Sequence, residues 1–217
     1  MLKRDRWRRP ALIATLLAAA ALGLGIAAAR KSAVSPHAGS GERSFISAVK
    51  HHLIARYPTR AQAIRVGYIA ITGIEKDGTA VYFNPRLTRV DRFHPNFLWY
   101  DKHGKLVGLD YEFPRSLYPK PPTALFGVSA TRWTTVKGHV HFNYRIGEGP
   151  LRMGMSHPRP NLRDNPITAS ELRADRLLPA RSRLVWAYNH PASWDLGFWL
   201  VPNPNGAFAA MNPNVRK

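Results

Sequence analysis

Two β-hairpins decide the fold, and the first of them reads YIAITGIEKDGTAVYFN over residues 68–84. Both halves are rich in β-branched and aromatic residues, and they flank Lys76-Asp77-Gly78, a combination typical of a hairpin. The second hairpin reads NFLWYDKHGKLVGLDYEF over residues 96–113, with its turn at residues 101–104. Consecutive hairpins pair their strands antiparallel, so this part of the chain favours an antiparallel sheet over βαβ units.

Further strands and two helices are predicted around the hairpins. Strand patterns span residues 133–146, 183–189 and 194–201, and the first is the longest. Apolar residues recur at helical spacing over residues 45–57, which predicts an amphipathic helix that ends at Pro58. A short helix is expected near residues 169–177, because Thr168 and Glu171 have the spacing of a capping box.

Together these elements predict one domain of the α+β class that is mainly β. We expect about seven strands in a single antiparallel sheet, a sandwich or a partly open barrel, and the sequence leaves these three arrangements open. One N-terminal amphipathic helix and one short helix complete the expected fold. The expected organisation is a signal peptide or membrane anchor at residues 1–30, a linker at residues 31–42 and a single globular β-rich domain at residues 43–217.

The first thirty residues have the pattern of an export segment. Several cations precede an uncharged stretch from Ala11 to Ala29, whose helical length of about 28 Å matches a bilayer core. Ala27-Ala28-Ala29 is a small-residue cleavage pattern, so the segment is either a signal peptide that is removed or a membrane anchor that is retained. More cations precede the apolar stretch than follow it. In both cases this predicts that the rest of the chain lies outside the inner membrane. The expected location is periplasmic or extracytoplasmic, with inner-membrane anchoring if residues 11–29 are retained.

Composition and charge exclude several classes of protein. Hydrophobic residues make up 45% of the chain, which excludes a disordered protein. The absence of cysteine excludes disulfides, zinc fingers and iron–sulfur clusters. The formal net charge of +19 suits anionic envelope components as partners, and the alternative is a basic surface that is only solvated. The cations are scattered along the chain and no RNA-recognition motif is present, so no specific nucleic-acid binding is expected.

The clearest candidate site is His139-Val140-His141 in the strand pattern 133–146. Alternation puts both imidazoles on one face of the strand, about 7 Å apart, where they can offer two ligands to one metal ion. By the same alternation Asp110 and Glu112 share the polar face of residues 105–113. If the two strands pair, they form a His-His-carboxylate site that suits zinc, copper or iron. The alternative is that all four side chains lie on the wet side of a sheet.

A second candidate site is Met153-Gly154-Met155-Ser156-His157. Thioether sulfur prefers Cu(I), and over these five residues the segment resembles the soft ligand sets of periplasmic copper-binding proteins. A joint copper site would use His139, His141, Met153, Met155 and His157. The alternative is that both methionines fill the core from a loop after Pro150.

The third candidate is His190, within Asn189-His190-Pro191-Ala192-Ser193-Trp194-Asp195. Serine, histidine and aspartate occur together there, but a catalytic triad needs the imidazole between the other two groups in space, which near neighbours in sequence rarely achieve. An acid at the start of a buried strand needs a partner. We therefore expect a buried His190–Asp195 pair that orients His190 as a ligand or base.

These patterns favour an exported or membrane-anchored extracytoplasmic binding domain, with no residue assigned to catalysis. The expected ligand is a metal ion, with copper favoured and zinc the alternative, or a small molecule, bound through the histidine-bearing strand face. The metal-site residues expected are His139, His141, Glu112, His190, Met153, Met155 and His157. One alternative is a cell-envelope interaction protein with a basic surface, whose histidines would be exposed and scattered. The other is a metal- or acid/base-dependent enzyme on the same face, with Asp110 or Glu112 as the base.

Overall fold

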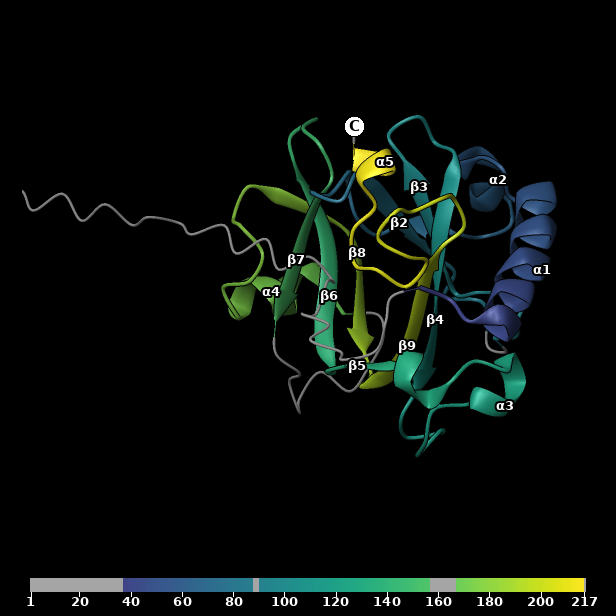
Figure 1. Cartoon of the computed structure of the whole chain (residues 1–217). Coiled ribbons are helices and arrows are strands. Elements are labelled where there is room, and N and C mark those ends of the chain that lie inside the picture. The colour runs from purple at the N-terminus through teal and green to yellow at the C-terminus, as the bar shows by residue number, and fades with distance from the viewer. Residues whose placement is uncertain (1–36, 88–89, 157–166, 217) are drawn as a thin grey trace, which may run out of the picture.

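The computed structural model describes residues 37–87, 90–156 and 167–216, which form two antiparallel sheets (Figure 1). The larger sheet has the strand order β1-β2-β3-β4-β9-β5, and the smaller has the order β7-β6-β8. The strands are β1 (Ile69–Ala70), β2 (Thr79–Phe83), β3 (Phe97–Asp101), β4 (Leu106–Pro114), β5 (Thr134–Val136), β6 (His139–Ile146), β7 (Arg152–Ser156), β8 (Ser182–His190) and β9 (Ser193–Trp199). The helices are α1 (Ser40–Arg56), α2 (Arg60–Arg65), α3 (Thr123–Phe126), α4 (Ala169–Ala174) and α5 (Pro213–Arg216), with a 3-10 turn η1 (Ala130–Arg132).

The predicted class, α+β and mainly β, is confirmed, and both hairpins form. β1 pairs with β2, and β3 pairs with β4, in antiparallel register. The predicted short helix is α4. The Thr168 hydroxyl accepts a hydrogen bond from Glu171 N–H at 3.2 Å, and the Glu171 carboxylate accepts one from Thr168 N–H at 2.6 Å. The described residues contain nine strands, more than the seven or so expected from the patterns.

One predicted strand divides between the two sheets. β5 lies at the edge of the larger sheet, where Thr134 pairs with Asp195. β6 is the central strand of the smaller sheet, where His139 pairs with His190. The chain crosses between the sheets at residues 137–138. Polar and apolar residues alternate in the same way on both sides of this point, because alternation is a property of a strand in either sheet. The sequence pattern therefore does not mark the crossing.

The methionine segment forms strand β7 instead of the loop considered above. β7 pairs with β6, and Gly154 lies opposite Phe142 in that pairing. The Phe142 ring packs so closely over Gly154 that a Cβ there would lie 2.1 Å from the ring. Glycine inside a strand usually weakens it, but at position 154 the strand requires glycine because the ring leaves no room for a side chain.

The two sheets pack face to face between two helical layers (Figure 1). α1 packs on the outer face of the larger sheet, where it buries Phe45, Val49 and Leu53. α4 covers the outer face of the smaller sheet and packs Leu172 with Phe142. The inner faces meet where the Phe83 and Trp186 rings lie 5.9 Å apart. The layer between the sheets is therefore an interior of the molecule with a sheet on each side.

The N-terminal helix begins within the expected linker. Glu42 caps α1 by accepting a hydrogen bond from Gly39 N–H at 2.9 Å, so the helix starts at Ser40. The expected export segment at residues 1–30 and residues 31–36 of the expected linker lie outside the described residues. Among the helices that the structure describes, none has the length and apolar character needed to cross a bilayer.

Candidate functional site

The layer between the sheets has an apolar part and a polar part. The apolar part contains Ile71, Val81, Phe83 and Phe97. The polar part, which we call the inter-sheet cluster, consists of three carboxyl groups and three imidazoles: Asp110, Glu112, Asp195, His139, His141 and His190. Asp110 and His139 are half-buried, and the other four are no more than 8% exposed. Such a concentration of ionisable groups inside a protein requires specific partners for each one.

His190 and Glu112 form a buried ion pair across the two sheets. His190 Nε2 lies 2.6 Å from Glu112 Oε2, and His190 Nδ1–H donates to the Pro191 carbonyl at 2.7 Å. Burial disfavours charge on the imidazole, but the Glu112 carboxylate outweighs burial and raises the pKa of His190. Asn96 fixes the Glu112 backbone by accepting from its N–H and donating to its carbonyl, both at 2.9 Å. The imidazole and the carboxylate are therefore held beside each other in a fixed place.

His139 stacks on His190, its partner in the β6–β8 register. The ring centroids lie 4.6 Å apart and the planes differ by 12°. His139 Nδ1–H donates to the Lys137 carbonyl at 2.9 Å, so the neutral ring carries its lone pair on Nε2. Burial lowers the pKa of His139, which favours that neutral form.

His141 is fixed through its other ring nitrogen. Its Nε2–H donates to the Ile71 carbonyl at 3.2 Å, and the Asn143 amide donates to the same oxygen. Burial lowers the pKa of His141 to about 4. His141 is therefore a neutral group that ties β6 to the chain just after β1.

The two aspartates form an acid pair beside the His190–Glu112 ion pair. Trp99 Nε1–H donates to Asp110 Oδ2 at 2.6 Å, and the Thr134 hydroxyl donates to Asp195 Oδ2 at 2.9 Å. Burial raises the pKa of Asp110, and so do the nearby Asp195 and Glu112 carboxylates and a hydrogen bond with Asp195. Two carboxyl groups this close are expected to share one proton, because ionising both is costly.

Four of the predicted site residues belong to the inter-sheet cluster, namely His139, His141, Glu112 and His190. Met153 and Met155 lie on the neighbouring strand β7, where Met155 pairs with His141. Directly paired residues point to the same face of a sheet, so both methionines share the face of the histidines. Met155 is 37% exposed and therefore lies at the rim of that face. His157 lies outside the described residues.

Two expected contacts are different in the structure. The hairpin strand β4 does not pair with the histidine strand β6; it pairs with β3 and β9, and Glu112 reaches His190 across the layer. The ion pair of His190 is with Glu112, whereas Asp195 accepts from the Thr134 hydroxyl and acts on His190 through its charge. The alternation of the sequence predicted which face of its strand each side chain occupies. The packing of the two sheets determines which residues that side chain contacts.

Sequence reasoning missed the residues that position the cluster, which are Asn96, Trp99 and Thr134. Each acts on a residue of a neighbouring strand, so no local pattern marks them.

Within the described ranges, no group of three or more His, Asp or Glu side chains is arranged to hold a metal ion.

No protein-family model, curated protein or solved structure matches this chain. The assignment of a function therefore depends on the chemistry of the inter-sheet cluster and on the charge and length of the predicted export segment.

Proposed function

We propose that the protein is an exported or membrane-anchored extracytoplasmic domain that binds a transition-metal ion through His139, His190 and Glu112. The observation that carries this proposal is the orientation of the two imidazoles. Each ring donates Nδ1–H to a backbone carbonyl, that of Lys137 for His139 and that of Pro191 for His190. This arrangement is usual for metal-binding histidines, because it fixes the ring and directs the Nε2 lone pair to the ion.

Glu112 supplies the carboxylate of a two-histidine, one-carboxylate ligand set. Its Oε2 lies 2.6 Å from His190 Nε2, and its charge also acts on the stacked His139 ring, so the three donors are neighbours. A metal ion would take the place of the proton that the raised pKa of His190 keeps on its imidazole. Because no described group is already arranged around an ion, we expect the ion to draw the three side chains together when it binds.

Copper is the favoured ion, and zinc is the alternative. Imidazole and carboxylate donors suit both ions, whereas thioether sulfur favours Cu(I). Met155 pairs with His141, and Met153 pairs with Asn143, on the strand next to β6. This register supports copper because it puts both sulfur atoms on the histidine-bearing face.

The test is the metal content of the full-length chain after chelation and reconstitution with Cu(I), Cu(II) or Zn(II) separately. Wild type should bind about one ion per chain, and His139→Ala/His190→Ala should bind almost none. The matched control is His51→Ala/His103→Ala, which removes two exposed histidines outside the cluster and should bind as wild type does. Calorimetry in buffers of different ionisation enthalpy should show about one proton released per ion.

Absence of binding in every form of wild type would overturn the proposal, as would equal binding by His139→Ala/His190→Ala. Circular dichroism identifies a variant that does not fold, and His139→Gln/His190→Gln then replaces it. Met153→Leu/Met155→Leu tests the choice of ion. Loss of Cu(I) with retention of Zn(II) supports copper, whereas unchanged Cu(I) binding excludes the thioether donors.

A second candidate function is acid–base catalysis, which the Asp110–Asp195 pair favours. A carboxyl group whose pKa is raised can donate a proton near neutral pH, and a neighbouring carboxylate can accept one. The test is turnover of nitrophenyl esters, glycosides and phosphates by the metal-free chain. Activity that is lost in Asp110→Asn would support an enzyme, and failure to turn over any of these substrates counts against one.

A further inference from the structure

The loop after β4 and helix α3 expose two leucines on the surface. Leu117 is 73% exposed and Leu125 is 49% exposed. A single exposed leucine is ordinary on a soluble protein. Two of them lie on one connected segment, residues 115–125, with half-buried Tyr118 between them. We call this segment the tip, and its exposed apolar side chains make it a candidate contact surface.

This tip is held in a fixed shape. The Pro114 carbonyl accepts hydrogen bonds from Leu117 N–H and Tyr118 N–H, both at 3.0 Å. Trp194 Nε1–H donates to the Tyr118 carbonyl at 2.9 Å, and the Arg115 guanidinium lies over the Trp194 ring at 5.1 Å. Leu117 is therefore presented on an ordered turn, which lowers the entropy cost of binding at this surface.

The segment of sequence that carries the tip has charges of one sign. No acidic residue occurs between Glu112 and Glu148, a stretch that contains Arg115, Lys120, Arg132, Lys137 and Arg145. Arg115 and Lys120 are exposed on either side of Leu117. Exposed leucines between cations, with tyrosine and tryptophan beside them, are the side chains that proteins use at the headgroup level of anionic bilayers.

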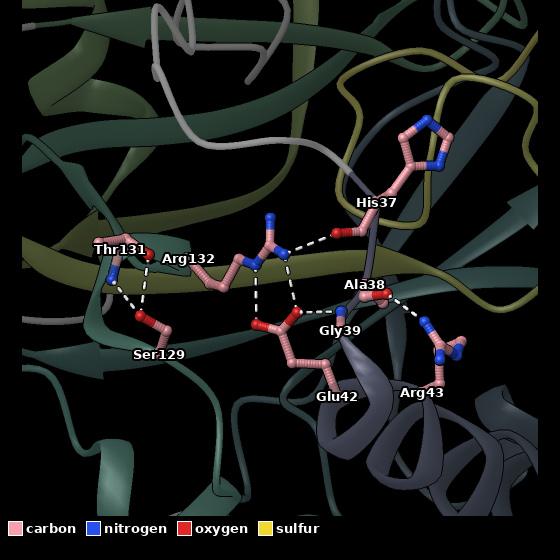
Figure 2. Close-up of polar contacts among 8 residues, drawn as sticks. All are labelled: His37, Ala38, Gly39, Glu42, Arg43, Ser129, Thr131 and Arg132. Atoms are coloured by element: carbon pink, nitrogen blue, oxygen red, sulfur yellow. Dashed lines mark hydrogen bonds and ion pairs between the residues drawn. The ribbon is translucent and has the colours of Figure 1, made fainter.

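The tip lies next to the point where the chain enters the described domain. Arg132, just after α3, donates to Glu42 Oε1 and Oε2 at 2.8 and 2.7 Å and to the His37 carbonyl at 2.8 Å (Figure 2). The Phe126 ring of α3 also lies 5.8 Å from the Phe45 ring of α1. Figure 1 shows α3 beside the first turn of α1, at the opposite end of that helix from α2.

The short sequence before His37 limits the distance between this end of the domain and the predicted anchor. Residues 30–36 separate the apolar segment 11–29 from His37, and seven residues span at most about 25 Å. A retained anchor would therefore keep the α3 end close to the membrane. The α2 end lies at the other end of α1, about 25 Å from the point where the chain enters the domain.

We propose that Leu117 and Leu125 insert into the headgroup region of the anionic membrane that holds residues 11–29, with Arg115 and Lys120 contacting the lipid phosphates. This proposal rests on the anchored form of the proposed function, and it is independent of metal binding. It fixes the orientation of the domain, with α3 toward the bilayer and α2 away from it. A second copy of the chain or a protein partner on the same surface would give a different outcome in the test.

The absence of cysteine allows single labels to report the orientation. Nitroxide is attached to Leu117→Cys, Leu125→Cys and the control Ile64→Cys, which is 52% exposed on α2. The full-length variants are reconstituted in phosphatidylcholine vesicles with or without phosphatidylglycerol. In anionic vesicles, labels at positions 117 and 125 should be several-fold less accessible to a water-soluble nickel chelate and more accessible to oxygen than the label at position 64. Arg115→Gln/Lys120→Gln should abolish this difference.

Flotation of the unlabelled chain with the vesicles separates the possible failures. A chain that does not float has no anchor, and that result overturns the anchored form together with the docking proposal, while the metal test is unaffected. Equal nickel accessibility at positions 117 and 64 in a chain that floats overturns the docking alone. Protection that appears equally in neutral vesicles and increases with the chain-to-lipid ratio also overturns it, in favour of contact between two copies of the chain.

Discussion

Replacing His141 by glutamine should destabilise the protein at neutral pH and stabilise it in acid. Glutamine can still donate a hydrogen bond to the Ile71 carbonyl, but it cannot titrate. In wild type, burial lowers the pKa of His141 from 6.5 to about 4. Between these two values the unfolded chain binds a proton that the folded chain does not bind. The free energy of unfolding of wild type therefore falls as the pH drops from about 6.5 to about 4.

The size of this effect follows from the two pKa values. At about pH 7.5 the imidazole is neutral in both states, so its titration contributes almost nothing. At about pH 4.5 the difference in proton binding lowers the free energy of unfolding by about 2–3 kcal/mol. Replacing a side chain that is only 3% exposed costs about 1 kcal/mol at either pH. The stability difference between wild type and His141→Gln should therefore change sign between these pH values.

The contribution of His190 has the opposite sign and a separate pH range. Its pKa is raised by Glu112 although burial opposes this, so its stabilisation is complete below the unfolded value of about 6.5 and is lost as the pH rises through the folded value. The titration of His190 therefore does not mask that of His141.

The assay is urea unfolding of the full-length chain in mild detergent, followed by tryptophan fluorescence at both pH values. His103→Gln is the matched control, because His103 is exposed in the β3–β4 turn, and its stability should follow that of wild type at both. If the wild-type and His141→Gln values differ by the same amount at both pH values, His141 is not a buried neutral group and the reasoning is wrong.

Two further predictions concern the neighbours of the cluster. Gly197→Ala should lower the free energy of unfolding by about 1–3 kcal/mol, because its Cβ would lie 2.1 Å from Asp110 Oδ1. The control Gly41→Ala in α1 has open space around it and should raise the free energy of unfolding by up to about 1 kcal/mol. The urea midpoints of the two variants test the difference. Glu112→Gln should cost the most stability below about pH 6.5 and progressively less at alkaline pH, because it removes the partner that raises the pKa of His190. A pH-independent cost in the same urea experiment would show that the pair carries no proton linkage.

The local parts of the fold could be predicted because their signals are adjacent in sequence. A hairpin needs two strand patterns and the turn between them, and the cap of α4 needs only Thr168 and Glu171. The division of residues 133–146 could not be predicted, because each half pairs with a strand from residues 182–199 and alternation is unchanged at the crossing. β7 was missed since Gly154 is favourable there only beneath the Phe142 ring.

The candidate site was predictable to the same extent. Alternation assigned His139 and His141 to one face of their strand and Asp110 and Glu112 to one face of another. It could not show that the two faces meet, because the contact of Glu112 with His190 depends on how the sheets pack. The sequence therefore pointed to Asp195 and not to Glu112 as the ion-pair partner of His190, although all three residues were among those named.

The position of the inter-sheet cluster argues that it has a role beyond stability. The apolar part of the same layer, where the Phe83 ring of the larger sheet lies 5.9 Å from the Trp186 ring of the smaller sheet, shows that these two sheets can be joined by hydrophobic packing, which stabilises by about 25 cal/mol for each Å² buried. A buried ion pair is on average no more stabilising than apolar side chains of similar size, because desolvation offsets the attraction. The cluster moreover draws its members from both sheets, so at least two separate segments must each carry polar residues for it to exist. Packing alone gives no reason for that arrangement, whereas the proposed binding of a metal ion in place of a proton would account for it.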